Sequence, residues 1–138
     1  MENKNRRRFT RIYFQWAVHL DFGLIEYKRY VANVSLSGFY VDGSFDQSIG
    51  DLCIIQLKQS GLYTNVVIRA VGSISRSTDN GIALEFHSMK LDSFFFLQAS
   101  LLCKAVNPSI LGNEFLDNEI FNIDGDIIFF RPYRLERG

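Results

Sequence analysis

The sequence contains little cysteine, little proline and no excess of charge of either sign. Its 138 residues include two cysteines, two prolines, 15 basic and 15 acidic side chains. A hydrophobic content of 47% with so little proline argues against a disordered chain and favours one folded domain with a real core. Each cysteine lies within an apolar stretch, so we expect Cys53 and Cys103 to be buried free thiols in a reducing cytosol.

Long hydrophobic runs are also absent. The strongest, Phe94–Leu97 and Ile127–Phe130, are far too short to span a bilayer. The first residues, MENKNRRRFTR, lack the apolar core of a secretory signal. We therefore expect a cytoplasmic protein that does not insert into a membrane.

The net charge of zero conceals an uneven distribution. Five basic side chains against one acidic give residues 1–11 a net charge of +4, which leaves −4 for residues 12–138. The basic residues are Lys4, Arg6, Arg7, Arg8 and Arg11. A neutral molecule with a basic arm argues against binding a nucleic acid polymer, which usually needs positive charge over a whole face. It leaves open a local site for a small anion.

Most of the chain has the pattern of short β-strands. From Thr10 to His87, apolar runs rich in Ile, Val, Phe and Tyr alternate with breaks at Gly and Asp. The clearest turn is Asp79-Asn80-Gly81, because Asn-Gly readily supplies the positive φ angles of tight hairpins. The strands are predicted near residues 11–20, 26–34, 38–42, 51–58, 63–76 and 80–87. Six short strands with short turns predict a mainly β fold, an antiparallel barrel or sandwich.

At Ser88 the apolar spacing becomes helical, and Ser88 can cap a helix that ends before Pro108. Two rings of Phe94-Phe95-Phe96 are expected to plug the open end of the barrel; the other interpretation is an exposed docking face. Beyond the helix, Glu114–Phe121 is compatible with a short helix and Asp126–Phe130 with a strand after an Asp-Gly turn. The chain thus divides into a flexible basic arm at 1–9, a barrel with its helix at 10–107, and an extension at 108–138.

Motifs of enzymes and metal sites are nearly absent. His19 and His87 lie at the ends of predicted strands with no nucleophile near them in sequence. No Cys or His pair has the spacing of zinc ligands, and Asp124-Gly125-Asp126 lacks the alternating ligands of a calcium loop. We predict no catalytic residues, no metal and no cofactor.

Two polar motifs carry the functional signal. In Arg7-Arg8-Phe9-Thr10-Arg11, two guanidinium groups are spaced four residues apart. Such a planar fork pairs with phosphate or with the O6/N7 edge of guanine, and its face stacks on bases. In Asn33-Val34-Ser35-Leu36-Ser37-Gly38, Asn33 and Ser35 lie two apart at the end of a strand, so both point to one face while Val34 and Leu36 point to the other. An amide and a hydroxyl suit the mixed donor and acceptor edge of a base, and Gly38 permits a sharp turn and close approach of a ligand.

Together the two motifs resemble those of the PilZ domain family. That family carries an RxxxR motif, often preceded by further basic residues, and a [D/N]xSxxG motif one hairpin later. The stretch Gly81-Ile82-Ala83-Leu84-Glu85-Phe86 also looks like the glycine-started closing strand common in the family. The resemblance covers roughly residues 5–106.

The resemblance implies a six-stranded antiparallel β-barrel with a C-terminal helix, and a receptor module for the bacterial second messenger cyclic di-GMP. By position in the motif, Arg7 and Arg11 would hold phosphates and the guanine edge while stacking on bases. Arg6 and Arg8 would help through their charge.

For the second motif, the resemblance implies that Asn33 and Ser35 hydrogen-bond a guanine and that Gly38 shapes the turn beneath it. Asn33 stands where the family also uses Asp, which removes a charge that could orient an arginine. A dianionic ligand would then bridge the arm to the barrel, order the arm and change the surface offered to a protein effector partner.

Three rival functions remain, in descending order. The first is a PilZ-like protein-interaction module that does not bind nucleotide. The second is a barrel that binds single-stranded nucleic acid, which the net −4 body disfavours. The third is an enzyme whose residues meet only in space. The resemblance says nothing of residues 108–138, which could pack on the barrel, form a homodimer contact or touch an effector, and Ile127–Phe130 is apolar enough to need burial.

Overall fold

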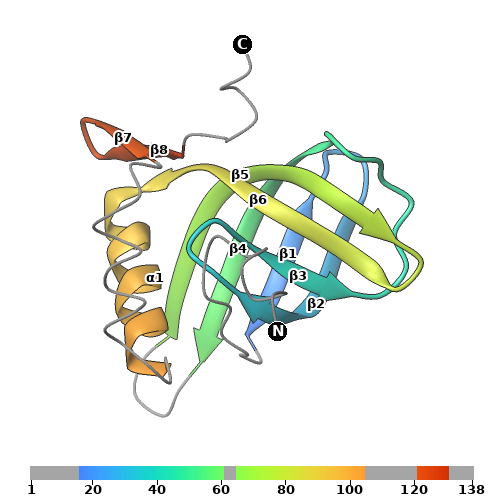
Figure 1. Cartoon of the computed structure of the whole chain (residues 1–138), viewed down its shortest axis with the longest axis horizontal. Helices are drawn as coiled ribbons and strands as arrows, with labels where there is room; N and C mark the ends of the chain where they lie inside the picture. The colour runs from blue at the N-terminus through green and yellow to red at the C-terminus, as the bar shows by residue number, and fades with distance from the viewer. Residues whose placement is uncertain (1–15, 61–64, 105–120, 131–138) are drawn as a thin grey trace, which may run out of the picture.

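The computed structural model describes residues 16–60, 65–104 and 121–130 (Figure 1). Its elements follow the chain in the order of eight strands with one helix between the sixth and seventh. They are β1 (Ala17–Asp21), β2 (Glu26–Val34), β3 (Gly38–Asp42), β4 (Leu52–Ser60), β5 (Asn65–Thr78), β6 (Gly81–Lys90), α1 (Leu91–Lys104), β7 (Phe121–Asp124) and β8 (Ile127–Phe130).

The first six strands form a closed antiparallel barrel. The order in the sheet is β3-β2-β1-β4-β5-β6-β8-β7, and an additional pairing between β3 and β6 closes the first six into a ring. Every strand pair is antiparallel. The prediction of a six-stranded barrel followed by a helix is therefore confirmed, and closure removes the free edges that an open sheet would expose.

The strand boundaries follow the turn signals closely. The predicted strand at 11–20 is described only from Trp16, and its regular part is β1; residues 11–15 lie outside the described residues. The turn at Asp79-Asn80-Gly81 joins β5 to β6 as expected. Its expected backbone is wrong, however, because among the described residues positive φ occurs only at Gly23, Gly43, Gly50 and Gly125. Asn80 and Gly81 therefore form this turn without left-handed angles.

The core lies inside the barrel and continues under α1. Inward side chains alternate along the strands, with Leu20, Ile55, Leu57 and Ile68 fully buried. Helix α1 contacts β5, β6 and β8 and covers one end of the barrel, as Figure 1 shows. Its apolar side chains Phe94, Leu97 and Leu101 are buried at the spacing that places them on one face.

Only one ring of the phenylalanine triplet is buried. Phe94 is 3% exposed, whereas Phe95 and Phe96 are 56% and 46% exposed. Successive helical residues point about 100° apart, so three neighbours cannot share one face. The expectation that two of these rings plug the barrel is wrong. Cys103 is exposed for the same reason, near the end of α1, so of the two thiols only Cys53 is buried as expected.

The helix begins at Leu91, two residues later than a cap at Ser88 would place it. Ser88 does not cap it; this residue lies in β6 and pairs with Val71 on one side and Phe129 on the other. Strand β6 runs on to Lys90 because β8 adds to its edge and supplies backbone partners there. The first helical amide, of Leu91, donates to the carbonyl oxygen of Asp126 at 2.7 Å, which ties the start of α1 to the β7–β8 turn.

The extension contributes a hairpin to the edge of the sheet. Its turn has Gly125 at φ 65°, and β8 matches the strand predicted there. The Phe130 ring packs against Phe86 of β6 and Phe94 of α1, with centroid distances of 5.6 and 6.1 Å. Of the predicted helix at Glu114–Phe121, residues 114–120 lie outside the described residues, and Phe121 begins β7.

Candidate ligand site at the β2–β3 turn

The turn between β2 and β3 presents alternate side chains to opposite sides. Val34 and Leu36 are fully buried, while Asn33, Ser35 and Ser37 are partly exposed. The expected division of this motif into a buried apolar face and an outer polar face is what the structure shows. The strand has an irregularity between Val31 and Asn33, where the pairing with β3 shifts register.

Hydrogen bonds hold this turn in one shape. The amide of Ser35 donates to the carbonyl oxygen of Gly38 at 2.8 Å, and the Ser35 hydroxyl donates to the same oxygen at 3.3 Å. The hydroxyls of Ser35 and Ser37 lie 3.4 Å apart, and the amide of Phe86 in β6 donates to the Ser37 carbonyl at 2.9 Å. Because the Ser35 proton is used internally, its oxygen is left as an acceptor for an N–H group of a ligand.

Gly38 is needed for a different reason from the one expected. It does not adopt a positive φ, so the turn itself does not require glycine. A Cβ atom at Gly38 would collide with the backbone carbonyl oxygen of Leu84 in β6. Glycine here lets β3 approach β6 closely enough to close the barrel beneath the motif.

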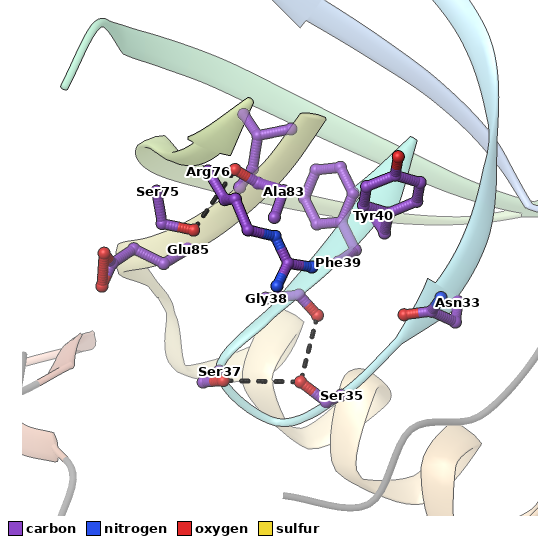
Figure 2. A pocket seen from close by; sticks show the side chains of 11 residues that line it. Asn33, Ser35, Ser37, Gly38, Phe39, Tyr40, Ser75, Arg76, Ala83 and Glu85 are labelled. Carbon is purple, nitrogen blue, oxygen red and sulfur yellow. Dashed lines mark hydrogen bonds between the residues drawn. The ribbon is translucent and has the colours of Figure 1, made fainter. Parts of the chain in front are cut away.

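The turn borders a pocket of about 120 Å³ on the outer surface of the barrel (Figure 2). Its base comes from β3 and β6, one side from the end of β2, and the opposite side from β5. Eleven residues line it: Asn33, Ser35, Ser37, Gly38, Phe39, Tyr40, Ser75, Arg76, Ala83, Leu84 and Glu85. The pocket is small and polar, with hydroxyl, amide, carboxylate and guanidinium groups around two small residues, Gly38 and Ala83.

Three of the seven residues predicted for the site meet in this pocket. Asn33, Ser35 and Gly38 line it. The four arginines, Arg6, Arg7, Arg8 and Arg11, lie outside the described residues. The pocket also contains two charged side chains that were not predicted for the site, Arg76 of β5 and Glu85 of β6. Arg76 belongs to no motif, whereas Glu85 lies in the glycine-started strand noted in the sequence.

A larger hollow, of about 400 Å³, lies on the outer face of β1, β2 and β4 and includes no residue of either motif. Its charged side chains are Lys28, Arg29 and Lys58 beside Glu26. Size alone does not make it the ligand site, because the convergent polar groups of the motif lie in the smaller pocket.

Comparison with known proteins bears on the identity of this site. Residues 5–101, which include both motifs and all the barrel strands, match the PilZ domain family. The chain belongs to the PilZ domain family. PilZ domains are cyclic di-GMP-binding and regulatory modules rather than catalysts. All the residues that line the polar pocket lie within the matched part of this PilZ domain.

Solved structures support the fold of this PilZ domain. One similar structure is that of the Bacillus subtilis inhibitor of motility, MotI/DgrA, with a TM-score of 0.58 and 13% sequence identity. The similarity covers 83% of this chain and 53% of that one, so this chain spans about half the length of its structural neighbour. At that identity the likeness concerns the fold alone. No curated protein sequence matches the chain.

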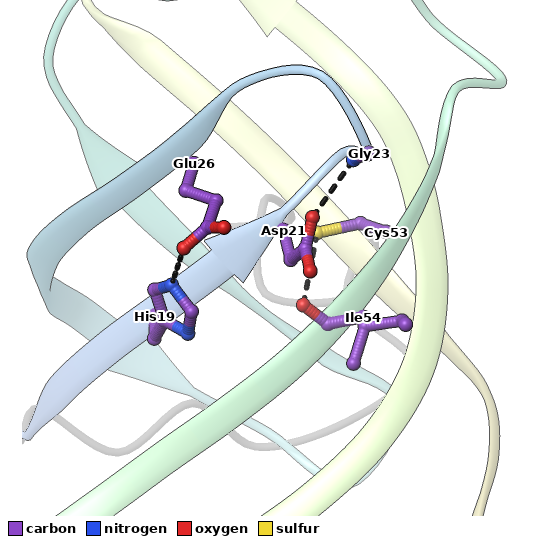
Figure 3. A network of polar contacts seen from close by, with 6 residues as sticks. All are labelled: His19, Asp21, Gly23, Glu26, Cys53 and Ile54. Carbon is purple, nitrogen blue, oxygen red and sulfur yellow. Dashed lines mark hydrogen bonds and ion pairs between the residues drawn. The ribbon is translucent and has the colours of Figure 1, made fainter.

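The side chains of His19, His87 and Cys53 each have a structural partner, and Figure 3 shows those of His19 and Cys53. His19 Nε2 lies 2.7 Å from Glu26 Oε1, and His87 Nε2 lies 2.8 Å from the hydroxyl of Ser73. Burial raises the pKa of the Cys53 thiol to about 12, and its Sγ contacts the carbonyl oxygen of Ile54 at 3.5 Å. A thiol with so high a pKa stays protonated at neutral pH and is a poor nucleophile.

Within residues 16–60, 65–104 and 121–130, no three His, Cys, Asp or Glu side chains gather where a metal ion could bind. Nor does this part of the chain contain a helix of the length and hydrophobicity needed to cross a membrane.

Proposed function

We propose that this PilZ domain is a cytoplasmic receptor that binds cyclic di-GMP in the pocket at the β2–β3 turn. The observation that carries the proposal is the convergence of Asn33, Ser35 and Gly38 on one pocket in a chain that matches the family across both motifs. The Asn33 amide offers a donor and an acceptor, and the Ser35 oxygen is held in place as an acceptor. These groups complement the edge of a guanine.

The arginine arm supplies the other half of the proposed site. The pocket itself contains one cation and one anion, Arg76 and Glu85, and so offers no excess of positive charge to a ligand with two phosphates. Arg7 and Arg11 would provide guanidinium forks for the phosphates and flat faces for the bases, with Arg6 and Arg8 adding charge. Ligand would join the arm to the barrel and so change the surface seen by a protein effector.

The test is a calorimetric titration with cyclic di-GMP, which gives both affinity and stoichiometry. We expect the wild type to bind and Arg11→Ala to weaken binding by roughly 10- to 150-fold, the range for losing a hydrogen bond to a charged group. Ser35→Ala should weaken it by roughly 2- to 10-fold, as for a neutral hydrogen bond. Ser77→Ala is the matched control, because Ser77 is an exposed serine of β5 outside the pocket.

Each outcome has a distinct meaning. An absence of heat with the wild type at high ligand concentration would overturn the receptor function and leave the alternative, a PilZ module that binds a protein partner without nucleotide. Equal affinities of the wild type and Arg11→Ala would overturn the role of the arm while leaving the receptor function intact.

A further inference from the structure

The register of the barrel places four side chains in one row across the pocket. Asn33 of β2 pairs with Tyr40 of β3, Tyr40 pairs with Ala83 of β6, and Ala83 pairs with Arg76 of β5. Directly paired residues lie on the same face of a sheet, with strands about 4.8 Å apart. Arg76 is thus the far end of the row that begins at the motif residue Asn33, although the two are distant in sequence.

The guanidinium of Arg76 lies over the pocket and, within the described residues, contributes no polar contact to the fold. Figure 2 shows it extending from β5 toward Gly38, with Asn33 on the other side of the pocket. Ala83, between Tyr40 and Arg76, is too small to fill the row and leaves room above the sheet. In the described part of the chain, Arg76 makes no ion pair and no side-chain hydrogen bond, and it is exposed.

The planar guanidinium of Arg76 suits the edge of a guanine. The guanine O6 and N7 edge is uncharged and presents two acceptors with the spacing of an arginine fork. An adenine presents an amino donor in place of O6 and cannot accept both bonds.

We propose that Arg76 is a specificity-determining residue that donates two hydrogen bonds to O6 and N7 of a guanine of the bound ligand. The inference rests on the proposed binding of cyclic di-GMP and adds to it a residue outside both motifs. Asn33 and Ser35 bind one side of the ligand from β2, and Arg76 binds a guanine from β5, on the opposite side of the pocket. Because Arg76 is fixed to a barrel strand, it reads the base independently of the arginine arm.

The experiment compares binding of cyclic di-GMP and cyclic di-AMP to the wild type, Arg76→Ala, Arg76→Lys and Arg69→Ala. Arg69 is an exposed arginine on the same strand but outside the pocket, so it controls for loss of one positive charge. We expect Arg76→Ala and Arg76→Lys each to lose about 5- to 150-fold in affinity for cyclic di-GMP, the discrimination of one bidentate base contact. Lysine keeps the charge but not the fork. Affinity for cyclic di-AMP should change little, and Arg69→Ala should resemble the wild type for both ligands.

The outcomes separate this inference from the proposed function. If the wild type binds cyclic di-GMP and Arg76→Ala binds it equally well, the inference is overturned while the receptor function stands. Full affinity in Arg76→Lys, or equal weakening of both dinucleotides in Arg76→Ala, would indicate a phosphate contact through charge and would also overturn it. A wild type that binds neither dinucleotide removes both proposals. Urea unfolding midpoints of the variants should match the wild type, because Arg76 has no partner in the described structure.

Discussion

Two glycines near the site are required by the close packing of strands. A Cβ atom at Gly38 would collide with the Leu84 carbonyl oxygen, and one at Gly81 would collide with the Val41 carbonyl oxygen and approach the Tyr40 ring atom Cζ to 2.8 Å. Both contacts lie between β3 and β6, the pairing that closes the barrel. Gly38, the glycine of the second motif, is therefore needed for strand packing whether or not it contacts a ligand.

The substitution Gly38→Ala tests this role in strand packing. The added methyl group must push β3 from β6 at a backbone atom that cannot rotate away, so we expect the free energy of unfolding to fall by about 1–3 kcal/mol. Urea denaturation followed by circular dichroism measures it. Ser37→Ala, one residue earlier in the same turn, adds no atoms and should cost less than about 1 kcal/mol. Unchanged stability in Gly38→Ala would show that the strands separate at no cost.

At the residue scale, the sequence predicted what depends on local periodicity and missed what depends on register. Asn33 and Ser35 share a face because they lie two apart on an extended segment, and any strand would place them so. Arg76 joins them only because β5, β6 and β3 pair in one particular register, which a single sequence does not reveal. Burial of Cys103 was predicted wrongly because apolar neighbours in sequence do not say which side of a helix a residue occupies.

At the scale of elements, the junction of β6 and α1 shows how tertiary pairing overrides a local signal. Ser88 has the residue type and position of a helix cap, yet it is a strand residue because β5 and β8 pair with it on both sides. The pairing with β8 depends on the β7–β8 hairpin, which comes about thirty residues later. By contrast, β2 and β3, which are neighbours in sequence and pair with each other, match the predicted ranges, and the ends of β4 and β5 differ from the prediction by one or two residues.

The hairpin also contributes to the core, and neighbouring phenylalanines of β8 test how much. Phe130 is 9% exposed and packs against Phe86 and Phe94, whereas Phe129 is 45% exposed on the other face. Phe130→Ala should lower the free energy of unfolding by about 3 kcal/mol, as for a buried ring, and Phe129→Ala by less than about 1 kcal/mol. Chemical denaturation of the two variants measures the difference. Equal costs would mean that the hairpin does not share the core of the barrel.

At the scale of the whole molecule, the proposed binding of cyclic di-GMP would explain the uneven charge distribution. Residues 1–11 carry +4 and the rest carries −4, so the arm is the segment that offers a small polyanion the most positive charge for its length. The pocket contributes one cation and one anion and so recognises the ligand mainly through hydrogen bonds. Affinity from the arm and base recognition from the barrel are then separable properties. Either half alone would bind weakly or without selectivity.

Hydrogen exchange read by mass spectrometry can test whether ligand joins the two halves. Saturating cyclic di-GMP should slow amide exchange of residues 5–11 by at least about tenfold, because a segment that gains hydrogen bonds on binding becomes protected. Peptides from β4, which contributes no residue to the pocket, are the internal control and should exchange at the same rate with and without ligand. In Arg11→Ala, measured at a ligand concentration that saturates it, protection of residues 5–11 should largely disappear while Asn33–Gly38 stays protected. Saturated binding to the wild type with no protection of residues 5–11 would show that the barrel holds the ligand without the arm, and would remove the ordering step from the proposed function.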